Sequence, residues 1–227
     1  MKIKYQKYEM KITIFLIILY LLVNSYCMNN YGIISYQNLI CNLIISISIL
    51  IFIIKNKLTY YYGLKKVKDI KKYLYFIPLL ILILANLING INISNNYNEI
   101  IIYVLVMINI GFLEEIIFRG FLFNSLKKDN INLAIIVSSL TFGVGHIMNI
   151  FFGAEIISTL IQMCYATSVG YLFVIIFHKS KSLLPCIITH MLVNTTSIFA
   201  NESNYNIPLL LTIIPIFYSL YIVNKIK

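Results

Sequence analysis

The feature that most constrains this chain is the length of its apolar runs. A helix needs about 20 mostly apolar residues to cross the roughly 30 Å hydrocarbon core of a bilayer. Eight stretches of the 227-residue sequence meet this requirement, and short polar loops separate them. Burying eight such runs in a soluble core would leave almost no amphipathic surface to face water. The sequence therefore predicts an all-α, polytopic transmembrane helical bundle. The ends of its spans are defined to within several residues. The predicted spans are 12–28, 36–54, 73–93, 100–124, 131–150, 155–177, 182–200 and 206–223.

The net charge of +10 raises the question of a nucleic-acid partner, and the positions of the cations answer it. Of the 18 Lys and Arg residues, 17 lie before the first predicted span or after the second, fourth, sixth and eighth, and the intervening loops carry none. This distribution follows the positive-inside rule. We therefore expect no nucleic-acid partner, both termini in the cytoplasm, and a multi-pass protein of the cell membrane. These cations are Lys2, Lys4, Lys7, Lys11, Lys55, Lys57, Lys65, Lys66, Lys68, Lys71, Lys72, Lys127, Lys128, Lys179, Lys181, Lys225 and Lys227.

The basic loop 55–72 divides the chain into two predicted parts. Residues 1–72 form two N-terminal anchor helices and a basic cytoplasmic loop, and residues 73–227 form a six-span catalytic membrane core. The first span resembles a secretory signal in its Lys-rich start, but its apolar region is longer than a usual signal core. We therefore expect an uncleaved anchor. The four cysteines form no C-x-x-C pair, so we expect them to be packing residues.

Three ionisable residues lie inside the predicted span 100–124: Glu114, Glu115 and Arg119. Each charge near a helix centre costs about 2.5–3.5 kcal/mol on insertion scales. Glu115 and Arg119 stand at i and i+4 with the acid nearer the N-terminus, which favours an ion pair. Glu114 is rotated by about 100° and has no such partner in its own span, so it needs a group on another helix, a water or a proton. An unpaired buried carboxylate indicates a functional site, whereas the alternative is that all three residues only tie helices together.

Two other spans carry strongly polar side chains at helix-repeating positions. The span 131–150 contains Phe142 and His146 one turn apart, with glycines between them that allow close helix contact. The span 182–200 contains His190 and Asn194 at i and i+4, so both project from one face. At 1.5 Å per residue, these groups and Glu114 fall near the bilayer middle or its cytoplasmic half. We therefore expect them to converge around a cavity that admits water.

These residues resemble a known family. The patterns Glu114-Glu115-x-x-x-Arg119, Phe142-x-x-x-His146 and His190-x-x-x-Asn194, in this order on three spans, are similar to the three motifs of the CPBP family. This family comprises CAAX prenyl protease type II-like and bacteriocin-processing intramembrane glutamic endopeptidases. The resemblance covers roughly residues 73–200, and the two leading helices lie outside its motifs.

The resemblance implies an intramembrane endopeptidase that works in the lipid bilayer on a membrane-associated peptide or lipidated protein. It implies that Glu114 is the general base and His146 its partner in activating a water. His190 and Asn194 would then form the oxyanion hole. The remaining motif residues, Glu115, Arg119 and Phe142, would support the site and line its cavity, and no cofactor is implied.

Three alternatives remain open from the sequence. Glu114, His146 and His190 offer a three-ligand zinc site with an open fourth position, although no H-E-x-x-H motif is present. Cys186 and His190 stand at i and i+4 and offer a cysteine dyad. The chain is also compatible with a non-catalytic membrane protein, such as a bacteriocin self-immunity protein or a small transporter.

Overall fold

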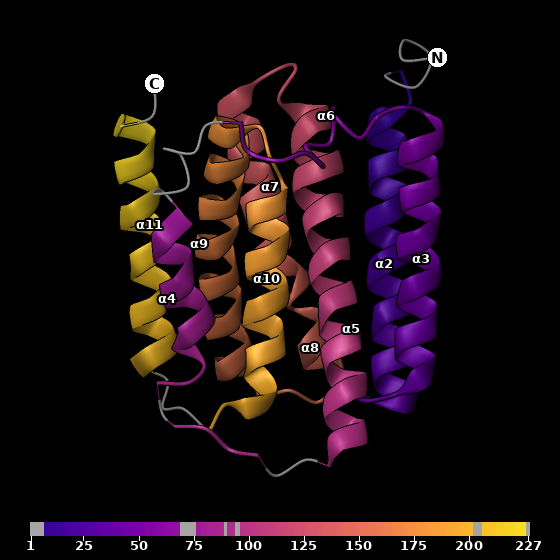
Figure 1. Cartoon of the computed structure of the whole chain (residues 1–227), viewed down its shortest axis with the longest axis vertical. Coiled ribbons are helices and arrows are strands. Elements are labelled where there is room, and N and C mark those ends of the chain that lie inside the picture. The colour runs from indigo at the N-terminus through magenta and orange to yellow at the C-terminus, as the bar shows by residue number, and fades with distance from the viewer. Residues whose placement is uncertain (1–6, 69–75, 89, 94–95, 202–205, 226–227) are drawn as a thin grey trace.

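The computed structural model describes residues 7–68, 76–88, 90–93, 96–201 and 206–225 as a bundle of helices that run alternately up and down (Figure 1). The first helix, α2, begins at the same end of the bundle at which the last helix, α11, ends. Within the described residues there is no β-strand, only an isolated antiparallel bridge between Ile91 and Ala200. The elements are α2 (Glu9–Tyr31), α3 (Tyr36–Lys55), α4 (Ile77–Ala85), α5 (Tyr97–Glu115), the π-helix η2 (Ile116–Phe123), α6 (Asn124–Leu126), α7 (Ile131–Gly145), α8 (Met148–Phe151), α9 (Ile156–Ser180), α10 (Leu184–Thr196), the 3₁₀-helix η3 (Ser197–Phe199) and α11 (Asn206–Lys225).

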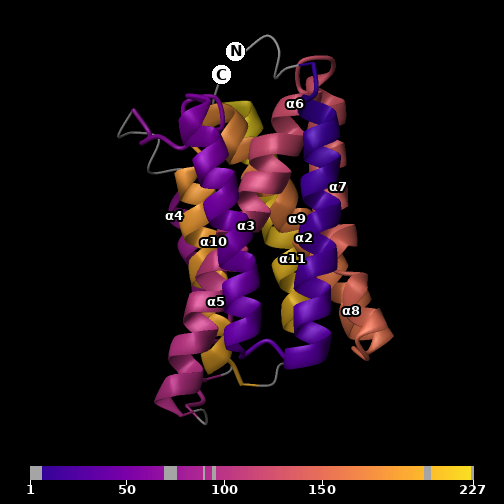
Figure 2. The ribbon, with the colours of Figure 1, turned by 90° about the vertical axis from the view of Figure 1, so that its right-hand side faces the viewer.

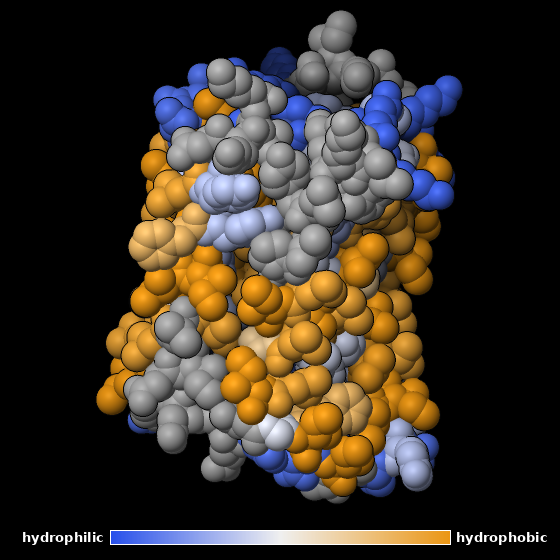
Figure 3. All heavy atoms as spheres, turned by 60° about the vertical axis from the view of Figure 1, so that its left-hand side comes forward, coloured by the Kyte–Doolittle hydropathy of each residue, from blue (hydrophilic) through white to orange (hydrophobic). Residues whose placement is uncertain are grey.

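The molecule has the surface of a membrane protein. An apolar band lies between two hydrophilic ends (Figure 3). In the part of the chain that the structure describes, five helices are long and apolar enough to cross a membrane, and two more apolar helices are shorter. The chain is therefore an all-helical, multi-pass membrane protein, as the sequence predicts. The five long helices are Glu9–Tyr31, Tyr36–Lys55, Tyr97–Leu126, Ile131–Phe151 and Ile156–Ser180.

The predicted span 73–93 is the one whose extent differs most from the structure. The helix observed there is α4, which has nine residues and ends at Ala85; residues 73–75 and 89 lie outside the described part. After α4 the chain turns, and the Asn86 side chain donates to the Val193 carbonyl at 2.7 Å and to Thr196 Oγ1 at 3.0 Å. The prediction of a helix up to residue 93 was therefore wrong, because Asn86 ends it by binding the neighbouring α10. The other seven predicted spans match observed helical runs to within a few residues.

Side-chain caps explain where several helices begin. The Ser35 hydroxyl accepts from the Asn38 amide at 3.2 Å before α3, and the Asn130 side chain accepts from the Leu133 amide at 3.0 Å before α7. Asn96 and Glu99 form a reciprocal capping box at the start of α5. These contacts satisfy backbone N–H groups that a helix leaves unpaired. The polar loops of the sequence thus set the helix starts.

The core is built around the helix that carries the two glutamates. α5 continues without a break into η2, and all eight residues of η2 are buried. α2 and α7 pack on η2, while α3 and α10 pack on α5. α2 and α3 together form one face of the bundle (Figure 2). The acid-bearing helix therefore has neighbours on several sides, and residues near Glu115 are shielded from lipid.

The loop after α3 covers one end of this core. Leu58 and Tyr62 are buried, and the Tyr62 ring stacks on Phe121 of η2 with 4.3 Å between centroids. The Gly63 carbonyl accepts from the Leu183 amide at 2.8 Å, which ties the loop to the start of α10. The described part of this basic loop is therefore packed onto the bundle as turns.

Candidate active site

A close contact between two helix backbones brings the acidic residues to His190. A Cβ at Gly111 of α5 would lie 3.0 Å from the Met191 amide nitrogen and 3.1 Å from its Cα. Gly111 therefore lets α5 and α10 approach at van der Waals distance. Glu114 and Glu115 follow one turn later and face the α10 residue His190.

The ion pair expected from the i, i+4 spacing is present. Arg119 Nη1 lies 3.0 Å from Glu115 Oε1, and both side chains are fully buried. The guanidinium carbon also stands 3.9 Å from the centroid of the Phe142 ring, which is a favourable cation–π position. A Cβ at Gly170 of α9 would lie 3.1 Å from Arg119 Nη2, so this glycine leaves room for the guanidinium. The buried cation is thus balanced by one carboxylate and one aromatic face.

His190 lies between the two glutamates. Its Nδ1 is 2.8 Å from Glu115 Oε1, and its Nε2 is 3.3 Å from Glu114 Oε2. A neutral imidazole has a single N–H, so it can donate to only one of two ionised carboxylates. Both contacts are hydrogen bonds only if the three groups hold one additional proton. With that proton, the four groups including Arg119 have no net charge, as burial of charges requires.

The second oxygen of Glu114 has a partner that the sequence did not indicate. The Tyr20 hydroxyl of α2 donates to Glu114 Oε1 at 2.7 Å, and Tyr20 is only 2% exposed. Tyr20 lies outside the predicted catalytic core of residues 73–227, in the first span, which is predicted to be an anchor. Tyr20 is one of 18 tyrosines and belongs to no motif, so its spacing gave no signal. Glu114 thus gains its partners from two other helices.

Glu114 and His146 line the same small cavity. Its volume is about 50 Å³, enough for a water molecule with room to spare, since a water occupies about 30 Å³ in the liquid. α2 forms one wall, and the end of α7 with α8 forms the other. The Phe142 ring meets both His146 and His190 edge-on, each with 5.7 Å between centroids. The structure therefore brings Glu114, His146 and His190 around Phe142.

Asn194 is placed differently from the other predicted site residues. It lies one turn beyond His190 on α10, and it does not line the cavity shared by Glu114 and His146. Its backbone carbonyl accepts from the Ser197 hydroxyl at 2.6 Å. Among the described residues, its side-chain amide makes no hydrogen bond. The amide is thus available to a further partner.

The geometry also bears on two of the alternatives. The Cys186 thiol donates to the Phe173 carbonyl at 3.4 Å, while both ring nitrogens of His190 face carboxylates, so no Cys186–His190 dyad is formed. Within the described ranges, no three His, Cys, Asp or Glu side chains are grouped as a metal site.

Comparison with known proteins agrees with the arrangement of the motifs. Residues 96–196 match the family model described as type II CAAX prenyl endopeptidase Rce1-like. This segment belongs to the CAAX protease family. Its range runs from the cap of α5 to the last residue of α10 and contains all three motifs of the CAAX protease pattern. No curated protein matches the chain closely. Tyr20, on α2, lies outside the part that matches the CAAX protease family.

Proposed function

We propose that this protein is a glutamic-type intramembrane endopeptidase that hydrolyses a peptide bond of a membrane-associated peptide or protein. One observation carries the proposal: Glu114 and His146 open into one water-sized cavity inside a membrane-crossing bundle. Both side chains belong to the segment that matches a protease family. A positioned base is typically worth a 10²–10⁴-fold rate enhancement, and it needs no nucleophilic side chain.

In the proposed reaction, a water in this cavity is held between Glu114 and His146. Glu114 takes a proton from the water, the oxygen attacks the scissile carbonyl carbon, and the carbonyl oxygen becomes an oxyanion. Glu114 then gives the proton to the leaving amine as the C–N bond breaks. The same carboxyl group thus serves as base and as acid, which balances the protons over the reaction.

The oxyanion is stabilised by His190 and Asn194 in this proposal. The contact between His190 Nε2 and Glu114 is 3.3 Å, longer than the 2.8 Å contact of Nδ1 with Glu115, so Nε2 is the nitrogen that can exchange its partner. The Asn194 amide supplies a second donor. Each such hydrogen-bond donor typically raises kcat by about 10²–10³-fold. Glu115 and Arg119 hold His190 in place through Nδ1, and Phe142 fixes its ring.

We further propose that the chain crosses the cell membrane eight times with both termini in the cytoplasm. The start of α2 and the end of α11 lie at the same end of the bundle (Figure 1), as an even number of crossings requires. The described lysines of the basic loops follow α3, α6 and α9 at that end. Reporter fusions in the loops 55–68 and 127–130 should give cytoplasmic signals, and fusions in the loops 32–35 and 152–155 should give the opposite. Signals on the same side for both sets of loops would contradict this topology.

The endopeptidase proposal is tested by comparing membrane peptides from cells that carry the wild-type chain, Glu114→Gln or His146→Ala. Mass spectrometry should find a product that depends on the wild-type chain and is lost in both variants. Glu155→Gln, an exposed carboxylate away from the cavity, is the matched control and should keep the product. If both site variants still give the product at normal abundance, the glutamic protease mechanism fails. If no product depends on the wild-type chain, a non-catalytic immunity role is favoured. Inhibition by a chelator that added zinc reverses would instead favour a metalloprotease.

A further inference from the structure

We propose that Tyr20 is a positioning residue for Glu114, which keeps the carboxylate aimed at the cavity. The kinetic consequence rests on the proposed function, but the contact itself does not. The Tyr20 hydroxyl donates to Glu114 Oε1 at 2.7 Å, while His190 Nε2 meets Oε2 at 3.3 Å. Two helices therefore hold the two oxygens of one carboxylate, and this fixes the plane of the group.

A tyrosine hydroxyl suits this task because it is neutral. A hydrogen bond to a carboxylate is charge-assisted, and it favours the ionised form. The other titratable or charged groups around Glu114 are His146 at the end of α7, His190 on α10, and Glu115 and Arg119 on its own helical run. The two histidines and Glu115 change the local charge when they gain or lose a proton, whereas Arg119 keeps a fixed charge. Tyr20 stabilises the base without altering the charge balance of the site.

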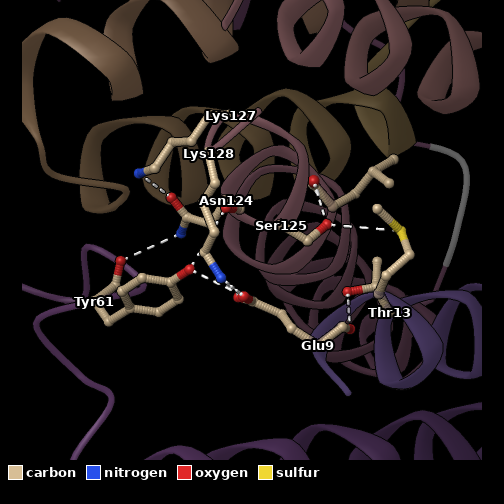
Figure 4. A network of polar contacts seen from close by, with 9 residues as sticks. Glu9, Thr13, Tyr61, Asn124, Ser125, Lys127 and Lys128 are labelled. Atoms are coloured by element: carbon tan, nitrogen blue, oxygen red, sulfur yellow. Dashed lines mark hydrogen bonds and ion pairs between the residues drawn. The ribbon is translucent and has the colours of Figure 1, made fainter. Parts of the chain in front are cut away.

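The helix that carries Tyr20 is fixed to the acid-bearing helix by a second set of contacts. Glu9, near the start of α2, is 1% exposed and pairs with Lys128 in the loop after α6. The Tyr61 hydroxyl donates to the same Glu9 carboxylate at 3.2 Å, so the group is held from two sides (Figure 4). At about 1.5 Å per residue, Tyr20 lies roughly 16 Å further along α2. These contacts limit sliding of α2, and they keep the Tyr20 hydroxyl at the height of Glu114.

The central variant is Tyr20→Phe, which removes the hydroxyl and keeps the ring. Without this donor, Glu114 Oε1 loses the hydrogen bond that ties it to α2. Hydrogen bonds to a carboxylate are charge-assisted and directional, so the orientation of the group is expected to change. Tyr26→Phe is the matched control, because Tyr26 lies on the same helix and is 61% exposed.

The direct test uses infrared spectroscopy of the purified full-length chain in detergent. The carboxyl stretching bands that Glu114→Gln removes report on Glu114. In Tyr20→Phe these bands should shift relative to the wild type, because one oxygen has lost its donor, and in Tyr26→Phe they should not move. Unchanged bands in a folded Tyr20→Phe protein overturn the proposal, whether or not the chain is a protease.

The kinetic test uses a peptide whose cleavage depends on the wild-type chain. In Tyr20→Phe, kcat should fall while KM changes little, because the substrate still binds but the base is no longer held in place. A change in KM alone would mean that Tyr20 only lines the path of the substrate. If Glu114→Gln still cleaves the peptide, the proposed function fails while the infrared result still decides the role of Tyr20.

Discussion

Replacing Arg119 by Met tests how the buried charges stabilise the fold. Methionine fills much of the space of the arginine stem, but it leaves the Glu115 carboxylate without the cation at 3.0 Å. The Coulomb energy of two charges at this distance is about 5.5 kcal/mol at an effective dielectric constant of about 20. Breaking a buried pair by removing one partner usually costs about 3–5 kcal/mol.

The expected loss in the free energy of unfolding is therefore about 3–5 kcal/mol. The chain has no tryptophan, so we suggest thiol labelling as the probe. Cys186 is fully buried in α10, and its protection from a maleimide in mixed micelles with increasing SDS reports on opening of the site. The labelled fraction of the Cys186 peptide is measured by mass spectrometry.

A double variant tests this account of the ion pair. In Glu115→Gln with Arg119→Met, neither partner of the pair is left as an isolated charge, so most of the loss should be recovered. A deficit below about 1 kcal/mol, or a double variant no more stable than Arg119→Met, would show that the pair does not act as described.

Two other predictions concern the packing of α7 on α9 and the partly buried lysine Lys127. In Gly143→Ala, the new Cβ would clash with Thr167 Oγ1 and lie 2.7 Å from the Met163 carbonyl oxygen, so α7 must move from α9 and the free energy of unfolding should fall by about 1–3 kcal/mol. Gly145→Ala, whose Cβ would meet a side-chain atom at 3.8 Å, should be tolerated, and equal losses in both variants would contradict this account. Burial and, to a smaller extent, neighbouring lysines lower the pKa of Lys127 to about 8. Acylation followed by mass spectrometry should therefore show half-maximal reactivity of Lys127 near pH 8, and a midpoint near the usual 10.4 would refute the prediction.

Local patterns in the sequence predicted much of the fold and part of the site. Apolar run lengths located the helices, since a bilayer demands a minimum length. The spacing of Glu115 and Arg119 predicted their ion pair, because residues four apart in a helix are neighbours. Run length and i, i+4 spacing are properties of a single helix, so they can be read from one sequence.

The remainder depends on how helices meet, which no local pattern specifies. The contact of Tyr20 with Glu114 joins residues 94 positions apart. The early end of α4 at Ala85 depends on Asn86 binding α10, and the placing of His190 between two carboxylates depends on the contact at Gly111. The π-helical form of η2 could likewise not be predicted from the sequence, because the apolar residues around Arg119 are equally compatible with an α-helix.

The wall that α2 contributes to the cavity limits how the chain can be divided. A polypeptide restricted to residues 96–196 would contain every family motif and still leave Glu114 open on the side where Tyr20 stands. Under the proposed function, such a fragment should show no cleavage, because α2 supplies a partner of Glu114 from outside the matched segment. The family motifs would then mark only part of the site, and a helix with no motif would complete it.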